Sequence, residues 1–289
     1  MILNIEQDCG LFSAMAIQTQ ITAEEKESAH WDLNLRPDLL DSDNALQAKL
    51  IEHCDFKGDE RAVYEKRVLR VTISENLEPF SGTALTRTKD YAQVFYDILR
   101  VHHWLSENAK ILHRDLHPGN IMLRRIGDKI YGVLNDFDRA SESVTRTGDR
   151  TLNQRTGTRP YMAIDMLDDT WRLGHMYRHD LESLFYIILS FACYNKPFSK
   201  WFTGTRTDVF DAKYTFFRTL REPDIPIRHH FRVFEPGLRQ MFSCIRRVYL
   251  PRILPRLGLD PDISFDQESM YEKFEKAMCS YNGVALETR

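Results

Sequence analysis

The segment that decides the fold is His113-Arg114-Asp115-Leu116-His117-Pro118-Gly119-Asn120, followed after two short apolar runs by Asp136-Phe137-Asp138. The runs Ile121–Arg125 and Lys129–Asn135 flank Gly127–Asp128, a dipeptide that favours a tight turn, and together they predict a β-hairpin. A hairpin brings the residue before its first strand close to the residue after its second strand. We therefore expect Asn120 and Asp136 to be neighbours.

Regular elements are predicted on both sides of this segment. Thr88–Asn108 carries apolar residues at helical spacing and predicts an amphipathic helix. Before it, Glu65–Ser74 alternates charged and apolar residues, which predicts a strand, and the Pro, Gly and Asn content of Glu75–Gly82 predicts a linker. After the segment 113–138, Arg139–Arg159 is polar and predicts a long surface loop, whereas His179–Cys193 predicts a buried helix.

Composition narrows the class of protein. The 289 residues are 43% hydrophobic and 28% charged, which is typical of a globular protein and excludes a wholly disordered chain. The net charge of −3 favours neither nucleic acid nor an anionic membrane as a partner. The longest apolar run, Leu184–Tyr194, is far shorter than the ~20 residues that span a bilayer, and the N-terminus lacks a basic signal-peptide region.

The cysteines and histidines do not predict a structural metal or a disulfide framework. The five cysteines include no Cys-x-x-Cys pair. His113 and His117 have the spacing of two helical zinc ligands, but no third ligand follows and Pro118-Gly119 breaks a helix. We therefore expect an intracellular protein, in the cytoplasm or the nucleus.

The segment around Asp115 resembles the catalytic loop of protein kinases, His-Arg-Asp with an Asn five residues after the Asp, followed by a variant of Asp-Phe-Gly. The resemblance implies an enzyme that uses ATP and Mg²⁺ to transfer the γ-phosphoryl group to a hydroxyl. Asp115 would be the catalytic base, and Asn120 and Asp136 would bind Mg²⁺ and through it ATP. His113 and Phe137 would pack together as part of the structural spine.

A further piece follows in kinase order. The segment Gly157–Asp165 resembles the end of a kinase activation segment, which here would run over residues 136–165. The resemblance implies that Thr158 contacts the catalytic aspartate, as in Ser/Thr kinases. Asp165 stands where the family has Glu, and it is expected to pair with a later arginine, for which Arg246 and Arg247 are the candidates.

Asp180 and Arg114 have expected structural roles. Asp180, in Asp-Leu-Glu-Ser-Leu-Phe, resembles the aspartate of the buried central helix of kinases and would brace the catalytic loop, residues 113–120. Taken alone, it is also a common helix-capping carboxylate. Arg114 is expected to bind a phosphate on one hydroxyl of the activation segment, although for any single hydroxyl a plain solvated loop is favoured. These hydroxyls are on Ser141, Ser143, Thr145, Thr147, Thr151 and Thr156.

The combination of Asp-Phe-Asp, Gly-Thr-Arg-Pro-Tyr-Met-Ala and His-Asp-Leu-Glu-Ser resembles the fungal-type protein kinase family, from about Arg67 to Ser190. That family also has Asp at the position of Asp138. His117 stands where Ser/Thr kinases usually have Lys. The string Asp-Leu-His-Pro-Gly-Asn instead resembles aminoglycoside and other small-molecule kinases, which weakens the case for a protein acceptor.

The N-terminal part departs from the kinase pattern. Before the linker it contains only Gly10 and Gly58, so no glycine-rich phosphate loop is present, and Lys49 lies in a helical pattern. We expect an α+β, protein-kinase-like fold with a reduced N-terminal lobe over residues 1–71 and a mainly helical C-terminal lobe over residues 72–289.

Three functions stay open. The first is a Ser/Thr protein kinase that acts on an unidentified protein substrate, without nucleic acid or membrane partners. The second is a pseudokinase or truncated kinase that acts as a binding module, which the missing glycine-rich loop favours. The third is a small-molecule phosphotransferase, which the full activation segment disfavours.

Overall fold

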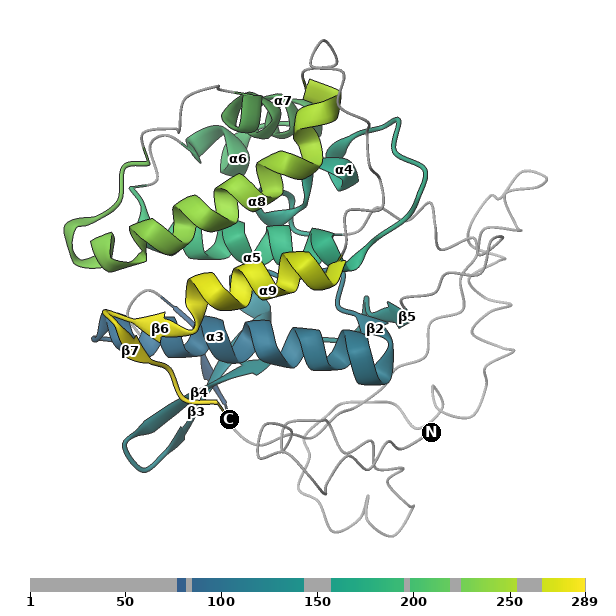
Figure 1. Ribbon diagram of the computed structural model, residues 1–289. Helices are drawn as coiled ribbons and strands as arrows, with labels where there is room; N and C mark the ends of the chain where they lie inside the picture. The colour runs from purple at the N-terminus through teal and green to yellow at the C-terminus, as the bar shows by residue number, and fades with distance from the viewer. Residues whose placement is uncertain are drawn as a thin grey trace, which may run out of the picture. The chain divides into compact units, whose positions relative to one another are not determined.

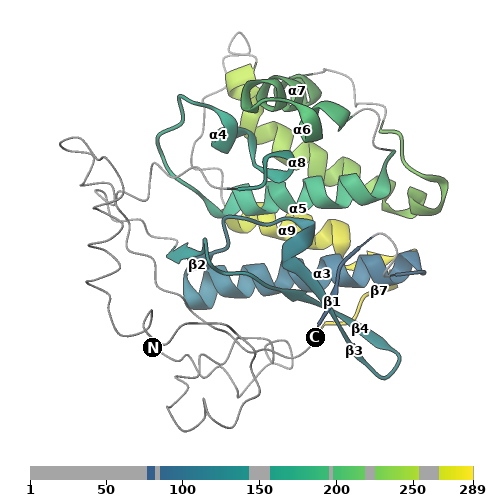
Figure 2. The same ribbon diagram turned by 180° about the vertical axis from the view of Figure 1, so that it is seen from behind.

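The computed structural model describes residues 77–81, 85–142, 157–194, 198–218, 225–253 and 267–288, which belong to one compact unit of the chain. Its longer helices are Thr88–Trp104 (α3), Tyr177–Ala192 (α5), Arg206–Arg218 (α7), Glu235–Ile253 (α8) and Gln267–Met278 (α9). The shorter ones are Ile164–Leu167 (α4) and Ser199–Thr203 (α6), with short 3-10 or π-helical segments at Leu105–Ala109 (η3), Pro118–Asn120 (η4), Arg159–Tyr161 (η6) and His229–Phe234 (η8). Figures 1 and 2 show α3, α5, α8 and α9 side by side.

The strands are short and antiparallel. Three of them form a sheet in the order β1-β3-β4, with bounds Glu78–Pro79, Ile121–Ile126 and Lys129–Leu134. Ile111–Leu112 (β2) pairs with Ser141–Glu142 (β5), and Ser280–Tyr281 (β6) pairs with Val284–Ala285 (β7). The described part of the chain is therefore mainly helical, with few strands.

Helix α3 forms where the apolar spacing predicts it, so the prediction over Thr88–Asn108 is confirmed. Asp90 in its first turn is paired with Arg87 and lies where a negative charge favours the helix dipole. The helix continues into the π-helical turn η3, and Lys110 ends it in the left-handed conformation at φ 55°. Its buried apolar side chains include Tyr91, Val94, Phe95, Ile98 and Leu99.

The predicted hairpin is also confirmed, and it packs directly on α3. Gly127 takes φ 62° in the turn between β3 and β4, where a residue with a side chain would be strained. At Gly132 a Cβ atom would lie 2.7 Å from the carbonyl oxygen of Val94, so only glycine allows this approach. The buried Asp97 of α3 accepts the Gly132 N–H at 2.9 Å and ties the hairpin to the helix.

Helix α5 lies at the centre of the core. The predicted buried helix His179–Cys193 is confirmed, although it begins two residues earlier, at Tyr177. It contacts α3, α8 and α9, which explains why apolar residues occur around most of its circumference. Aromatic rings fill the space beside it, where Phe217 of α7 stacks on Phe242 of α8 with ring centroids 5.1 Å apart.

Two segments predicted to be irregular contain short strands, so these predictions were partly wrong. In the predicted linker Glu75–Gly82, Glu78–Pro79 pairs with β3 and places Glu78 opposite Leu123. In the predicted surface loop Arg139–Arg159, Ser141–Glu142 pairs with β2. A strand of two residues has no periodicity to detect. Such a strand forms only by pairing with the edge of a neighbouring strand.

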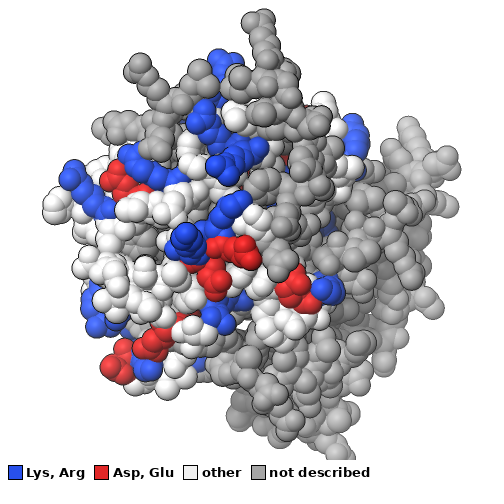
Figure 3. Space-filling model, viewed as in Figure 1, with Lys and Arg blue, Asp and Glu red and all other residues white. Residues whose placement is uncertain are grey.

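Several predictions lie outside the described residues. They are the reduced N-terminal lobe over residues 1–71, with its strand Glu65–Ser74 and Lys49, and the hydroxyl side chains of residues 143–156. In the described ranges, no helix is both long enough and apolar enough to cross a membrane. Figure 3 shows Lys and Arg interspersed with Asp and Glu on one face, so the charges give that face no single sign.

Candidate active site

Asp180, buried at the start of α5, holds the loop 113–120 in place. Its carboxylate accepts the backbone N–H groups of His113 at 3.0 Å and of Arg114 at 3.2 Å. His102 Nε2 and His175 Nε2 each lie 2.8 Å from it. Burial alone would raise the pKa of Asp180, but the two histidines lower this pKa well below its usual value. The bracing contact predicted from the sequence is therefore present, and two unpredicted histidines reinforce it.

Arg114 has an unusual backbone conformation at this anchor. Its φ of 68° lies in the left-handed region, which a non-glycine residue adopts only when surrounding contacts hold it there. The two hydrogen bonds from the His113 and Arg114 N–H groups to Asp180 supply that constraint. Burial lowers the pKa of the Arg114 guanidinium. Of its expected phosphate-bearing partners, the structure describes only Ser141, in β5.

His113 and Phe137 are in contact, as expected for the spine. Their ring centroids are 5.1 Å apart with the planes at 62°, an edge-to-face arrangement. His113 Nε2 donates a hydrogen bond to the carbonyl oxygen of Asn135 at 2.9 Å. Burial lowers the pKa of His113, so the imidazole is neutral near pH 7. These contacts connect the loop to the residues that follow β4.

Asp115 binds two residues that are distant in sequence. Its Oδ1 accepts the N–H of Thr158 at 3.0 Å and the Thr158 hydroxyl at 3.2 Å. Its Oδ2 lies 3.3 Å from Nε of Arg139, and 12% of the Asp115 side chain is exposed. The Thr158 contact was expected. The Arg139 contact was not expected, because Arg139 lies in a segment whose only predicted feature was a polar surface loop.

Asn120 and Asp136 lie at the same end of the hairpin. The N–H of Asn135, the residue before Asp136, donates to the carbonyl oxygen of Asn120 at 2.8 Å. The Asn120 amide nitrogen donates to the Asp115 carbonyl at 2.9 Å, and this bond fixes which side-chain atom is the nitrogen and which is the oxygen. Asp136, at φ 58°, is exposed, and its Oδ1 accepts the Asp138 N–H at 3.3 Å.

This donor set fits Mg²⁺. One amide oxygen and one carboxylate are hard ligands, and protein-bound Mg²⁺ usually keeps several phosphate or water oxygens as well. Within the described residues, no three or more His, Cys, Asp or Glu side chains gather as a metal site. Asn120 and Asp136 could hold Mg²⁺ only if further oxygen atoms, such as the phosphates of a nucleotide, complete its coordination.

The partner of Asp165 differs from the prediction. Asp165 is completely buried, and its Oδ2 lies 2.5 Å from the Arg178 guanidinium and 3.1 Å from His179 Nε2. The partner is therefore Arg178, at the start of α5, and the expectation of Arg246 or Arg247 from α8 was wrong. The sequence could not decide this, because a buried ion pair depends on tertiary packing and leaves no pattern along the chain.

The rest of the segment after Thr158 is held by buried polar groups that the sequence did not single out. Glu182 of α5 accepts the N–H of Ile164 at 2.9 Å and the hydroxyl of Tyr186 at 2.6 Å. Lys213 of α7 donates to the Met162 carbonyl at 2.6 Å, with its ammonium 3.6 Å from the Tyr186 ring centroid. Burial lowers the pKa of Lys213 well below its usual value. Helices α5 and α7 thus hold this segment in place through hydrogen bonds to its backbone.

His179 is completely buried in its neutral form. Its Nδ1 accepts the Met176 N–H at 2.9 Å, so Nε2 carries the proton donated to Asp165, and the ring is neutral. Burial lowers the pKa of His179 to about 3, although the hydrogen bond to Asp165 acts to raise it.

We therefore predict that the free energy of unfolding decreases as the pH falls from 6.5 towards 3. Over this range the unfolded chain binds a proton at His179 that the folded chain does not, which costs about 1.4 kcal/mol per pH unit. Urea unfolding at pH 7, 6 and 5 measures this slope. The His179→Gln variant should show a smaller slope, and an equal slope in both proteins would contradict the assignment.

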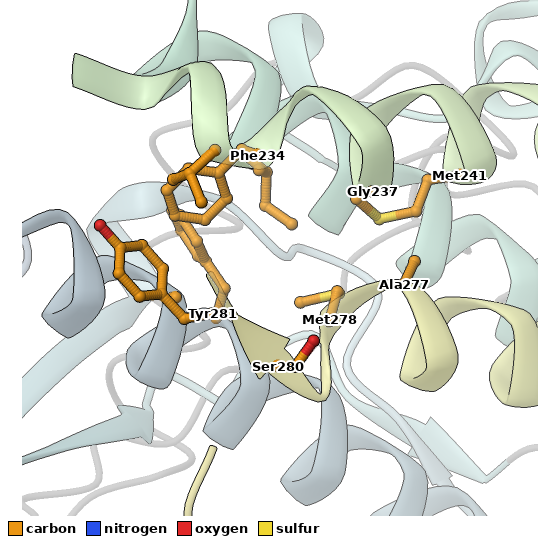
Figure 4. A pocket seen from close by; sticks show the side chains of 11 residues that line it. Phe234, Gly237, Met241, Ala277, Met278, Ser280 and Tyr281 are labelled. Carbon is orange, nitrogen blue, oxygen red and sulfur yellow. The ribbon is translucent and has the colours of Figure 1, made fainter. Parts of the chain in front are cut away.

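The structure has a small cavity at Asp115 and a larger apolar one elsewhere. The cavity beside Asp115, Thr158 and Tyr161 measures about 10 Å³, roughly room for one water. The apolar cavity of about 40 Å³ lies between α3, α8 and the end of α9. Figure 4 shows Phe234 and Tyr281 on one side of it and Gly237 on the other. Its lining offers no carboxylate or cation for phosphoryl chemistry.

Comparison with known proteins identifies the family. The sequence model of the fungal protein kinase family matches residues 9–192, more than half of the chain. The chain belongs to the fungal protein kinase family. The resemblance seen in the motifs is confirmed, and the family match begins well before Arg67, where the motifs began. The mainly helical structure with its few antiparallel strands fits the α+β protein kinase fold of this family.

A curated relative gives a weaker similarity. A dual specificity mitogen-activated protein kinase kinase of Caenorhabditis elegans is 29% identical over 101 residues, which are 35% of this chain. The chain spans about 28% of the length of that relative.

Proposed function

We propose that this fungal-family kinase transfers the γ-phosphoryl group of Mg²⁺-ATP to a Ser or Thr hydroxyl of a protein substrate. The observation that carries the proposal is the contact of Thr158 with Asp115. It joins the end of the activation segment to the carboxylate of the catalytic loop. Family membership and the similarity to a protein kinase kinase support the same reaction class.

The roles of the residues follow from their positions. Mg²⁺-ATP, when bound, supplies the phosphoryl group and the charge of the metal. Asn120 and Asp136 hold the metal through hard oxygen atoms. Asp115 accepts the hydroxyl proton of the acceptor, and Thr158 fixes its Oδ1, so the carboxylate keeps one orientation. Asp180 keeps the loop rigid through its hydrogen bonds to the backbone of His113 and Arg114, which preserves the geometry of Asp115.

The test is nucleotide binding followed by thermal unfolding. ATP at ~100 times its Kd with Mg²⁺ should stabilise the chain by about 2.7 kcal/mol, which raises the melting temperature by several degrees. The shift should require Mg²⁺ and disappear in Asp136→Ala. Asp128→Ala, which removes an exposed carboxylate in the hairpin turn, is the matched control and should keep the shift. No shift in the unaltered chain would contradict the proposal and favour a pseudokinase that acts as a binding module.

A small-molecule acceptor is the second candidate function, and one sequence feature favours it. The string Asp-Leu-His-Pro-Gly-Asn around His117 resembles small-molecule kinases. The fixed segment from Thr158 to Leu167 argues against it, because the resemblance associates that segment with protein acceptors. Transfer of labelled phosphate to a peptide array, compared with a panel of aminoglycosides and small hydroxyl metabolites, separates the two. Labelling of small molecules alone would overturn the choice of a protein substrate.

A further inference from the structure

The two oxygens of Asp115 have different partners. Oδ1 is bound by Thr158, through two hydrogen bonds. Oδ2 faces the guanidinium of Arg139, at 3.3 Å from Nε. A base needs an oxygen that an acceptor hydroxyl can reach. The guanidinium therefore lies at the oxygen where the acceptor hydroxyl and the transferred group would meet.

Backbone contacts on both sides fix the position of Arg139. The N–H of Ala140 donates to the Phe137 carbonyl at 3.0 Å and closes a turn that contains Arg139. The next residue, Ser141, begins β5 and pairs with Leu112 of β2, directly before the catalytic loop. Arg139 is thus held between the Mg²⁺-binding Asp136 and a strand pair next to Asp115.

The ring of His117 is bound to the backbone of its own turn. Its Nδ1 accepts the Gly119 N–H at 3.1 Å, so the ring folds back on its own turn. A Cβ atom on Gly119 would lie 2.8 Å from the ring, which shows how closely the ring covers this residue. Related Ser/Thr kinases usually have Lys at this position of the catalytic loop. In this chain the ring is committed to the backbone and an acceptor nitrogen faces Gly119.

We propose that Arg139 is the cation that stabilises the transferred phosphoryl group, an inference that rests on the proposed kinase function. The planar guanidinium donates in a fork that matches phosphoryl oxygens, and phosphoryl transfer depends on such charge stabilisation. The ion pair with Asp115 leaves 47% of the Arg139 side chain exposed. A pair this exposed is weak, so the guanidinium can move from Oδ2 to the phosphoryl oxygens when nucleotide binds.

The bond changes do not involve Arg139 directly. The bond between the γ-phosphorus and the ADP oxygen breaks, and the acceptor oxygen forms the new bond to phosphorus. The hydroxyl proton goes to Asp115, and ADP leaves with the electron pair of the broken bond. Arg139 takes part only through its charge and its hydrogen bonds.

The experiment measures the preference for a γ-phosphate in the absence of turnover. Calorimetry gives Kd for ADP and for a non-hydrolysable ATP analogue, both with Mg²⁺. The preference is the Kd for ADP divided by the Kd for the ATP analogue. Arg139→Ala should reduce this ratio by about ten-fold, because a charge-assisted bond to the γ-phosphoryl is lost. Adding His117→Lys to Arg139→Ala should restore most of the ratio. Arg125→Ala, another half-exposed arginine paired with a carboxylate, is the matched control and should change nothing.

Turnover gives a second measurement. In Arg139→Ala, kcat should fall by about 10²-fold or more, with an unchanged KM for the acceptor and an unchanged melting temperature. An unchanged ratio of nucleotide constants would overturn the inference alone. So would a rise in kcat, because Arg139 would then be an inhibitory lock on Asp115. Absence of any nucleotide binding by the unaltered chain would overturn the proposed function, and the inference with it.

Discussion

In the Asp115→Asn variant, phosphoryl transfer is expected to fall by about 10²–10⁴-fold, while Mg²⁺-ATP binding stays unchanged. An amide cannot accept the proton of the acceptor hydroxyl, so general-base catalysis is lost. The amide oxygen can still accept the two hydrogen bonds from Thr158, because the side chain keeps its shape. Initial rates with saturating ATP, together with the thermal shift produced by Mg²⁺-ATP, measure both parts of this prediction.

The control for this substitution makes the same chemical change at another carboxylate. Asp128→Asn, in the exposed turn of the hairpin, should keep the full rate. If Asp115→Asn retained the rate of the unaltered chain, Asp115 would not be the base, and the assignment of the catalytic loop would fail. A loss of rate accompanied by loss of the Mg²⁺-ATP shift would instead place Asp115 in nucleotide binding.

Local patterns in the sequence were sufficient for the elements that carry the site. The apolar spacing of Thr88–Trp104 depends only on helix geometry, and the hairpin depends on a turn dipeptide between two apolar runs. The proximity of Asn120 to Asp136 could be predicted as well, because a hairpin brings the residues at its two ends together. The short strand Glu78–Pro79 could not, because it exists only where the edge of β3 is available.

Contacts between distant residues were predicted only where the family resemblance supplied them. The contact between Thr158 and Asp115 is an example, and so is the anchoring of the loop by Asp180. The contact of Arg139 with Asp115 had no such guide, because an arginine in a polar stretch is usually a solvated residue. The same is true of the buried Lys213, which nothing in its helix distinguishes from a surface lysine.

Arg178→Met is expected to lower the free energy of unfolding by about 3–5 kcal/mol, the effect of breaking a buried ion pair. Asp165 is completely buried and Arg178 is 4% exposed, so the substitution leaves a carboxylate without its main counter-charge. The guanidinium also lies 5.3 Å from the ring of Trp171, a contact that methionine replaces only in part. Urea unfolding at pH 7 measures the change.

A double variant separates the buried charge from the packing. In Asp165→Asn with Arg178→Met, both charges are removed, and the amide oxygen still accepts a hydrogen bond from His179. This double variant should recover at least half of the stability that Arg178→Met loses, because most of the cost is the uncompensated carboxylate. Arg247→Met, at an exposed position of α8, should cost at most about 0.5 kcal/mol. If Arg247→Met lowered the free energy of unfolding more than Arg178→Met does, the arginine that stabilises Asp165 would come from α8. A double variant as unstable as Arg178→Met would mean that Arg178 stabilises the segment by packing on Trp171 and not by neutralising Asp165.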